Sequence, residues 1–476
     1  MKKELFWDYS MTEPSLTTAE VVMHKPVKRE IVMLHDEPWE GDSCGYHNIV
    51  AEDGFYRMYY LARKSDGKVK GGLIIPGLAC YAESKDGIKW RKPNLGIYSY
   101  NGLTENNIII DDNDDLLDNF FVFKDTNPST PDSERYKGVA VSYLGSKSGD
   151  DVALWCHISS DGIHFKKGWI MTREGYFDSL NTVVWSERDQ LYYCFFRGYH
   201  ENEEGKLIRD IRVMTSKDFK IWENNSVQFK YNTPHDFQMY TNGIFQYPEN
   251  KDYLVGLATR YTERTEWTDN YDELCGREKR KKIIDMWEPR SGLALTDCIL
   301  ITSRDGYNWH RFDEAFMVPG IEKKDNWVYG DCYPCIGMIE TESGEADAPN
   351  EMSLYMKEGH HSCKPAPLYR YTIRKDGFAS LHAGFEEKKA VTKPFEYSGG
   401  ELHINFTASP AGHVYINVLD EAGTPIDGLS SCELFGDALD RYVKFDDKLQ
   451  ELAGSKIRLE FIMSDADIYS FVFKQR

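Results

Sequence analysis

The sequence predicts an all-β protein, a five-bladed β-propeller followed by a C-terminal β-sandwich. A pattern of serine, Asp-Gly and a following aromatic residue recurs along the first 385 residues, and apolar runs precede its copies. Beyond residue 385 the pattern changes, and segments such as 402–406 and 414–419 alternate between apolar and polar residues. Such alternation, with Gly, Pro and Asp between the segments, predicts the strands of a sandwich. We therefore expect the propeller at residues 1–385 and the sandwich at residues 386–476.

Each copy of the repeated pattern predicts a tight turn in the outer hairpin of one blade. Residues 84–90 read Ser-Lys-Asp-Gly-Ile-Lys-Trp, and the Asp-Gly pair suits a turn because glycine accepts a positive φ. Repeats of this size with several short strands each are typical of β-propellers, and five copies predict five blades. The other copies are residues 159–165, 216–222 (with Phe219 at the glycine position), 303–309 and 374–378.

The blades are expected to follow one another in order along the chain. Residues 1–40 form a lead-in that packs against the propeller, and the inner strands begin near residues 46, 117, 177, 236 and 327. A polar insertion at residues 262–284 contains the basic run 277–282, which we expect to be a solvated loop. No strong helix is expected anywhere in the chain.

Composition and charge disfavour several classes of partner. The formal net charge of −20 argues against nucleic acid and anionic membranes, because both require a positive surface. No run of about 18 apolar residues is present to span a membrane. The N-terminal residues lack the apolar run of a signal peptide, which predicts a cytoplasmic protein. The 10 cysteines are scattered, as expected of reduced thiols rather than a disulfide framework.

Two short motifs resemble metal or redox sites, and we interpret both differently. Cys332 and Cys335 form a lone C-x-x-C, whereas zinc sites usually need a second pair, so a buried strand is the better interpretation. Residues 360–363, His-His-Ser-Cys, lack a fourth ligand and favour a loop. We predict no cofactor and no metal ligand set; a structural calcium ion on the propeller axis, near His47, stays open.

A propeller brings the starts of its inner strands together around a central funnel. Polar residues at these starts are therefore candidates for a site, since apolar core residues would otherwise be expected there. Several carboxylates that face one cavity suit glycoside hydrolysis, in which one acts as acid and another as base or nucleophile. Crowding raises the pKa of one of them and keeps it protonated for the acid role. The candidates at strand starts are Asp42, His47, Asp118, Asp178, Asp236, Gln238 and Trp327.

These features resemble the superfamily of arabinanases, levansucrases and invertases, glycoside hydrolase families 32, 43, 62 and 68. The closest local match is residues 117–125, Leu-Asp-Asn-Phe-Phe-Val-Phe-Lys-Asp, where family 43 has Asp-Pro, apolar residues and Phe-x-Asp. The resemblance implies that Asp118 is the transition-state modulator and that Asp178 replaces the general-acid glutamate. By the resemblance, the family's base or nucleophile aspartate falls near His47, where this chain has no acid. Asp42 is the nearest acid, five residues earlier, and Asp236 and Glu358 stay open as alternatives.

The resulting hypothesis is a glycoside hydrolase for a small glycoside or oligosaccharide, such as a fructo- or arabinofuranoside. Its catalytic candidates are Asp42, Asp118 and Asp178. Two alternatives keep the fold: a phosphorylase that uses inorganic phosphate, and a non-catalytic carbohydrate-binding propeller. For Asp125, holding its own loop is an equal alternative to meeting substrate, and a homo-oligomer through the sandwich stays open. The predicted substrate-binding residues are His47, Asp125, Arg197, Asp236, Gln238, Arg260, Glu288, Arg290, Trp327 and Glu358.

Overall fold

The structure, a computed structural model, divides the chain into two compact units. The larger comprises residues 26–342 and 352–372, and the smaller comprises residues 1–25, 343–351 and 373–476. This division differs from the predicted boundary at residue 385, because the first 25 residues and the segment from 373 onward belong to the smaller unit. The described residues are 3–63, 77–110, 117–142, 152–223, 226–286, 289–324, 326–360, 365–445 and 447–475.

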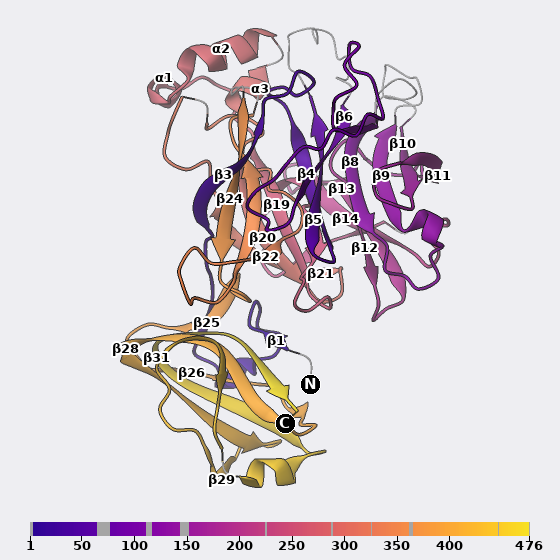
Figure 1. The fold of residues 1–476 in the computed structure, drawn as a ribbon. Helices are drawn as coiled ribbons and strands as arrows, with labels where there is room; N and C mark the ends of the chain where they lie inside the picture. Colours follow the sequence, from indigo (N-terminus) through magenta and orange to yellow (C-terminus); the bar gives the residue numbers. More distant parts are fainter. Residues whose placement is uncertain are drawn as a thin grey trace. The chain divides into compact units, whose positions relative to one another are not determined.

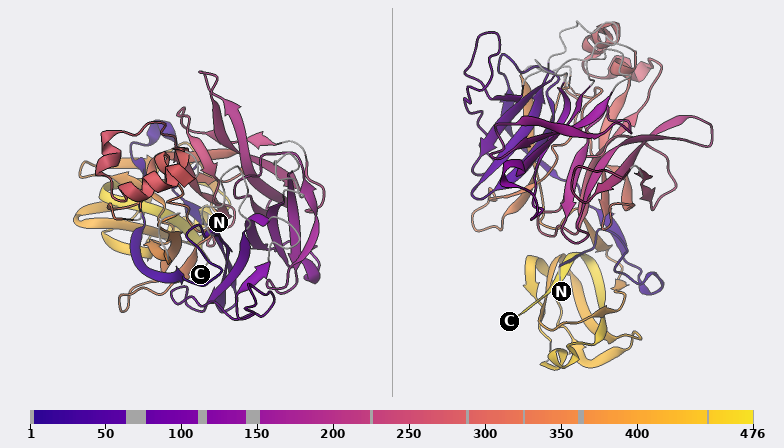
Figure 2. Two further views of the ribbon diagram at one scale, coloured as in Figure 1. Left: turned by 90° about the horizontal axis from the view of Figure 1, so that it is seen from above. Right: turned by 90° about the vertical axis from the view of Figure 1, so that its right-hand side faces the viewer.

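The larger unit is the predicted five-bladed β-propeller. Five separate sheets, antiparallel except for one short strand pair, follow one another along the chain (Figure 1), and Figure 2 shows them from two further sides. Blade one has β4 (Gly45–Glu52), β5 (Phe55–Ala62), β6 (Leu78–Ser84) and β7 (Ile108–Ile110). Blade two has β8 (Leu117–Lys124), β9 (Tyr136–Ser142), β10 (Ala153–Ser159) and β11 (Lys166–Thr172), with a 3-10 turn at Asp132–Glu134. Blade three has β12 (Thr182–Ser186), β13 (Leu191–Glu201), β14 (Leu207–Ser216) and β15 (Val227–Gln228).

The last two blades depart from four consecutive strands. Blade four has six strands, among them the short β16, which pairs with β21 in parallel. Blade five takes its outermost strand, β3 (Val27–His35), from the N-terminal segment, so that Ala366 pairs with His35. The predicted lead-in is therefore partly a strand that closes the propeller. The remaining strands are β16 (Lys230–Tyr231), β17 (Gln238–Thr241), β18 (Ile244–Gln246), β19 (Leu254–Thr262), β20 (Leu295–Ser303), β21 (Asn308–Met317), β22 (Ile339–Thr341), β23 (Glu351–Lys357) and β24 (Ala366–Ile373).

The polar insertion is helical, which corrects the expectation of a solvated loop. It forms α1 (Asp269–Glu273), α2 (Arg277–Met286) and α3 (Pro289–Leu293) at the end of the blades drawn uppermost in Figure 1. Tyr271, Leu274 and Leu293 form a small apolar cluster between the helices. Within the basic run, Arg280 is buried and donates hydrogen bonds to the carbonyls of Gly292 and Trp327. None of the helices in the described part of the chain is long and apolar enough to cross a membrane.

The smaller unit is one nine-stranded sheet wrapped around an apolar core. Its two long strands, β28 (Glu401–Asp420) and β31 (Lys456–Lys474), pair along most of their length. The pairing is interrupted between Ala408 and His413, and apolar residues from both halves of β28 enter the same core. One continuous sheet therefore supplies the walls expected of a sandwich. The other strands are β1 (Glu4–Leu5), β2 (Glu20–Met23), β25 (Ala379–Ala383), β26 (Lys388–Val391), β27 (Phe395–Glu396), β29 (Pro425–Ser430) and β30 (Gly436–Tyr442), with 3-10 turns at Pro14–Leu16 and Asp447–Leu452.

The repeated pattern forms the same hydrogen-bonded turn in four blades. In blade one, the Ser84 hydroxyl oxygen accepts from Gly87 N (2.9 Å), and Asp86 Oδ1 accepts from the next two backbone N–H groups (2.8 and 2.7 Å). The glycine position has a positive φ in these four copies, including 64° at Phe219, whereas in the fifth copy Asp376, and not Gly377, has the positive φ. Phe219 tolerates this conformation because its ring is fully buried against Trp222 and its neighbours. The equivalent turns contain Asp161, Asp218 and Asp305.

Acidification is expected to destabilise the propeller through these turns. Burial alone would raise the pKa of Asp86, Asp161 and Asp305, but hydrogen bonds from the turn outweigh burial and lower the pKa of each. The folded pKa lies below the unfolded value of about 3.9, so each carboxylate stabilises the fold above that pH. The stabilisation is lost as the pH falls through the folded pKa. In thermal melts between pH 7 and 3, Tm should fall steeply below about pH 4.

The variant Asp161→Asn provides the control for this prediction. It should start with a lower Tm at pH 7 and lose less of it on acidification, since one of the responsible carboxylates is gone. An equally steep loss in the variant would contradict the assignment.

Candidate active site at the propeller mouth

The inner strands of the blades begin at one end of the propeller, which we call the mouth. Blades one and two enter it with the same backbone irregularity. Tyr46 and Asn119 both have a φ of 54°, and each lies in a β-bulge at the start of its strand. The bulge follows Gly45 in blade one and Asp118 in blade two, so these two positions are equivalent. Blade one therefore has a glycine where blade two has its carboxylate, and Asp42 lies in the loop before β4.

Asp118 is a buried carboxylate with a fixed cationic partner. It starts β8 opposite Val141 of β9, and its side chain forms an ion pair with Arg63, which follows β5 of blade one. Arg63 in turn lies 5.6 Å from the ring centroid of Tyr46. The pair holds the Asp118 carboxylate in one orientation and balances its charge.

Asp178 is held differently, on a short loop that exposes it. Phe177 anchors the loop because it is buried, and Asn181 Nδ2 donates to the carbonyls of Phe177 (3.0 Å) and Ser179 (2.8 Å). The Asp178 side chain is 76% exposed, with Oδ2 3.6 Å from NH1 of the buried Arg197. At that distance the guanidinium attracts the carboxylate without forming a close hydrogen bond. Asp178 is thus positioned by its backbone and free to reach a substrate.

Tyrosine rings line the mouth between these groups. Tyr333 stacks on Tyr46 (centroids 6.3 Å apart, 24° between planes) and on Tyr240 (6.0 Å, 23°). The Tyr240 and Tyr329 hydroxyls are hydrogen-bonded to each other. Aromatic walls with a few placed polar groups are typical of ligand sites.

Tyr46 connects the blade-two and blade-three groups. Burial raises the pKa of the Tyr46 hydroxyl, and Tyr240, Arg63, Asp178 and Arg197 all act on it electrostatically. The partner of Asp118 and the side chain of Asp178 are therefore both neighbours of one phenol. Asp118 and Asp178 are therefore candidates for one site.

His47 is predicted to meet substrate, but the structure places it between blades. Its Nε2 lies 2.9 Å from Nε2 of His35, whose Nδ1 lies 2.8 Å from the Ala366 carbonyl oxygen. His35 Nδ1–H must donate to that carbonyl, so His35 Nε2 accepts from His47 Nε2–H. Burial lowers the pKa of His35 to about 3 and that of His47 well below its usual value. The neutral pair joins β4 to β3, the strand that closes the propeller.

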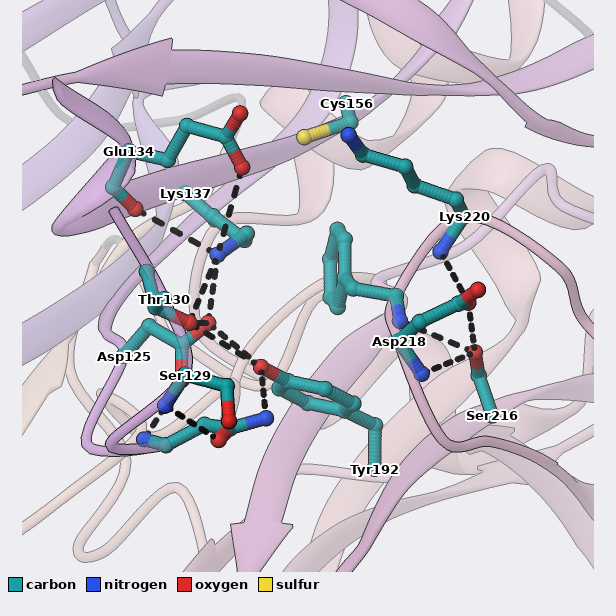
Figure 3. A network of polar contacts seen from close by, with 12 residues as sticks. Asp125, Ser129, Thr130, Glu134, Lys137, Cys156, Tyr192, Ser216, Asp218 and Lys220 are labelled. Carbon is teal, nitrogen blue, oxygen red and sulfur yellow. Dashed lines mark hydrogen bonds and ion pairs between the residues drawn. The ribbon is translucent and has the colours of Figure 1, made fainter.

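Asp125 lies at the opposite end of β8 from Asp118, and its contacts fit the alternative role of holding its loop. It forms a buried ion pair with Lys137 and accepts hydrogen bonds from Thr130 Oγ1 (2.8 Å) and Tyr192 OH (2.8 Å) (Figure 3). The Asn127 backbone N–H donates to its other oxygen (2.9 Å). The prediction that Asp125 binds substrate does not fit this position, because β8 separates Asp125 from the mouth.

Asp125→Asn should therefore destabilise the protein and leave its activity intact. Removing one partner of a buried ion pair leaves the other charge uncompensated and costs about 3–5 kcal/mol. Urea denaturation should report that loss, and turnover below the unfolding range should stay at the wild-type level. Loss of activity in a protein of unchanged stability would show that Asp125 does meet substrate.

Three predicted residues of blade four lie at its rim with partners of their own. Arg260 pairs with Asp297 through two contacts (2.9 and 2.5 Å) and donates to the Asp313 carbonyl (2.8 Å). Asp236 lies 3.0 Å from His200 Nε2 and lines a cleft of about 590 Å³ that Arg209 also lines. Gln238 accepts from Arg209 NH1 (3.0 Å). Asp236 and Gln238 therefore both lie near Arg209, whereas Arg260 is held by Asp297 and the Asp313 carbonyl.

The remaining predictions concern blade five and the helical insertion. Glu358 is buried in ion pairs with Lys28 of β3 and Lys323, so it points toward the outer strands of blade five. Trp327 packs against the apolar cluster of the helices and donates to the Gly320 carbonyl (2.8 Å). Arg290 of α3 acts electrostatically on Tyr329 at the mouth. Glu288 lies outside the described residues.

Several residues at the mouth are absent from the sequence prediction. They are the tyrosines Tyr46, Tyr240 and Tyr333 and the arginines Arg63 and Arg209. Tyr333 lies between Cys332 and Cys335; both cysteines are buried, as predicted, but the segment forms an isolated β-bridge at Pro334 instead of the predicted strand. The available signal is positional: Tyr46 and Tyr240 occupy strand starts, as the predicted aspartates do.

Among known proteins, the chain is similar to several solved structures. An N-acetylgalactosamine deacetylase from F. plautii, in complex with blood group B trisaccharide, is 12% identical (TM-score 0.45; 74% of this chain, 96% of that one). A fructofuranosidase variant from Schwanniomyces occidentalis, complexed with fructosylnystose, is 11% identical (0.43; 96% and 99%). A structure from the GH130 family of mannoside phosphorylases and glycoside hydrolases is 13% identical (0.42; 78% and 96%). No protein-family model and no curated protein matches the chain.

Proposed function

We propose that the protein is a glycosidase that cleaves a small glycoside at the propeller mouth. The observation that carries the proposal is a pair of carboxylates in contrasting environments at the starts of neighbouring blades. Asp118 is buried and balanced by Arg63, whereas Asp178 is exposed near Arg197. Glycoside hydrolysis needs two carboxyl groups with different roles, and contrasting environments are how proteins separate such roles.

Each carboxylate has a role that suits its environment. Asp178 is free to approach the oxygen of the leaving group, so we assign it as the general acid. Asp118 keeps a fixed negative charge, which stabilises the positive charge that develops on the sugar ring in the transition state. The tyrosine rings supply flat apolar surfaces against which the sugar ring packs.

The base or nucleophile comes from blade one in this proposal. Gly45 occupies the position equivalent to Asp118, so the strand itself supplies no side chain there. Asp42 lies three residues earlier and is partly exposed, and its carbonyl accepts a hydrogen bond from Lys357 Nζ (3.0 Å). We assign Asp42 to this role as the acidic residue of the preceding loop.

The same glycine favours a second candidate, a glycoside phosphorylase. A phosphorylase replaces the protein nucleophile with inorganic phosphate, which arginine binds through paired N–H groups. Arg197 lies near Tyr46 and has donor groups for this purpose, and Arg63, which is paired with Asp118, lies near the same ring.

Sugar release from a panel of aryl glycosides and short oligosaccharides, with and without phosphate, tests the proposal. Release without phosphate supports the hydrolase, and release that requires phosphate supports the phosphorylase. Binding of sugar without any release would contradict both and leave a carbohydrate-binding propeller.

A further inference from the structure

We propose that the mouth binds an oxyanion, a carboxylate or a phosphate, between Arg197 and Arg209 beside the ring of Tyr240. The inference rests on the proposed function and specifies its chemistry. Either the sugar carries the anionic group, as a hexuronic acid does, or inorganic phosphate supplies it as a second substrate.

Arg197 is a buried cation with unused donor capacity. Its residue is only 5% exposed, and its NH2 donates to the Tyr240 carbonyl (3.2 Å). Its NH1 stays 3.6 Å from Asp178, and its Nε–H has no hydrogen-bond partner among the described residues. A buried guanidinium that lacks acceptors is costly, so this position favours a ligand that provides them.

Arg209 approaches the same ring from the next strand of blade three. Its guanidinium carbon lies 5.1 Å from the ring centroid of Tyr261, 5.5 Å from that of Tyr240 and 6.0 Å from that of Tyr199. Its hydrogen-bond acceptor is the neutral amide oxygen of Gln238. Within the part of the chain that the structure describes, Nε–H of Arg209 is also buried without a partner. The rings hold the cation in place and leave its edge for a ligand.

The two arginines contact the same ring. The guanidinium carbon of Arg197 lies 4.6 Å from the Tyr240 centroid, and that of Arg209 lies 5.5 Å from it. Guanidinium groups match carboxylate and phosphate oxygens in geometry, and such charge-assisted hydrogen bonds are about twice as strong as neutral ones. We place the oxyanion beside this ring, where it would accept from the guanidinium groups and balance their charges.

Further cations lie near the two arginines, although the whole protein is acidic. Arg290 and Lys206 add two further cations, since both act on Glu263 together with Arg209. Carboxylates are also near: Glu263 is paired with Lys206 (2.8 Å), Asp178 lies by Arg197, and Glu201, Glu203, Glu204, Asp210 and Asp236 line the cleft that Arg209 also lines. The buried guanidinium nitrogens that lack a partner among the described residues, and not a positive field, therefore favour an anion here.

Matched ligands and variants test the inference. We would measure kcat/KM for aryl hexuronides and for the corresponding neutral aryl hexosides, and the latter again with phosphate. Calorimetry would measure binding of glucuronate, galacturonate and inorganic phosphate. The variants are Arg209→Gln, which removes the charge, Arg209→Lys, which keeps it, and Arg304→Gln as control. Arg304 lies 4.5 Å from the Tyr253 ring in the repeat turn of blade four, away from the mouth.

If the sugar carries the anion, hexuronides should be cleaved at least about tenfold faster than neutral hexosides. Arg209→Gln should abolish that preference, Arg209→Lys should retain part of it, and Arg304→Gln should match wild type. If phosphate is the anion, it should accelerate cleavage of neutral hexosides, and Arg209→Gln should raise the half-saturating phosphate concentration about tenfold. A factor of ten corresponds to about 1.4 kcal/mol.

Two results would overturn the inference. In the first, neutral hexosides are cleaved as fast as hexuronides, phosphate has no effect, and Arg209→Gln has the same activity as Arg304→Gln. The glycosidase assignment would then stand without the anion site. If no glycoside is cleaved, the proposed function fails, and calorimetry still decides the inference. Anion binding that Arg209→Gln weakens would support the site, and equal binding or none would refute it.

Discussion

Asp178→Asn should reduce kcat by about 10²–10⁴-fold, the usual contribution of a positioned general acid. Asparagine has nearly the same shape but cannot deliver the proton to the leaving oxygen. KM should change little, because Asp178 makes one long contact, with Arg197, and is otherwise exposed. For the same reason, Tm should stay at the wild-type value. Steady-state kinetics and a thermal melt on one preparation check both statements.

Asp125→Asn provides the opposite pattern and so serves as a control for Asp178→Asn. It removes a carboxylate from the far end of β8, where stability depends on it and the proposed chemistry does not. A variant at Asp178 that keeps wild-type kcat would remove the general acid from the account.

Asp118→Asn should lower both activity and stability. The substitution leaves Arg63 partly buried without its counter-charge, a change that costs about 3–5 kcal/mol when one partner of a buried pair is lost. It also removes the fixed negative charge that stabilises the sugar cation, so kcat should fall by about 10²–10³-fold. Urea denaturation and kinetics measure the two effects separately.

The double variant Arg63→Gln with Asp118→Asn distinguishes charge balance from chemistry. It removes both charges together, so much of the lost stability should return, whereas activity should stay low. Recovery of activity with stability would show that Asp118 acts only by holding Arg63, and would contradict its proposed role in the transition state.

The architecture could be predicted because it repeats locally. Each Ser-x-Asp-Gly turn is held by hydrogen bonds within six residues, so the sequence pattern is sufficient to indicate it. Four of the five predicted copies form this turn, whereas the fifth, residues 374–378, lies in the smaller unit, so the count of five blades was right although one copy does not belong to a blade. The pattern also places Asp118 and Asp178 near strand starts, where the structure finds them.

What could not be predicted depends on contacts between distant segments. His47 looks like a ligand because it starts a strand, but β3 pairs with β24 across more than 300 residues and brings His35 against it. The β-bulge at Tyr46 interrupts the regular alternation of side chains along β4. As a result, Gly45, and not His47, is the position that corresponds to Asp118. Arg209 lies within β14, and its sequence neighbours give no sign of a site. The rings of Tyr240 and Tyr261, which belong to blade four, come close to it only in the folded structure.

The helical insertion was mispredicted for a related reason. The composition of its six-residue basic run suggests full solvation. Arg280 is nevertheless buried, and its guanidinium donates hydrogen bonds to the carbonyls of Gly292 in α3 and of Trp327. Charge density alone does not show that one member of a run is directed inward. The buried hydrogen bonds depend on the fold of the whole insertion.

The most direct test of the central claim is the dependence of kcat/KM on leaving-group pKa, compared between wild type and Asp178→Asn. Aryl glycosides from dinitrophenyl to unsubstituted phenyl span leaving groups that need progressively more help from an acid. If Asp178 donates the proton, the variant should lose little with dinitrophenol as leaving group and about 10²–10⁴-fold with phenol. An equal loss for every leaving group would show that Asp178 does not act as the acid and would contradict the assigned mechanism.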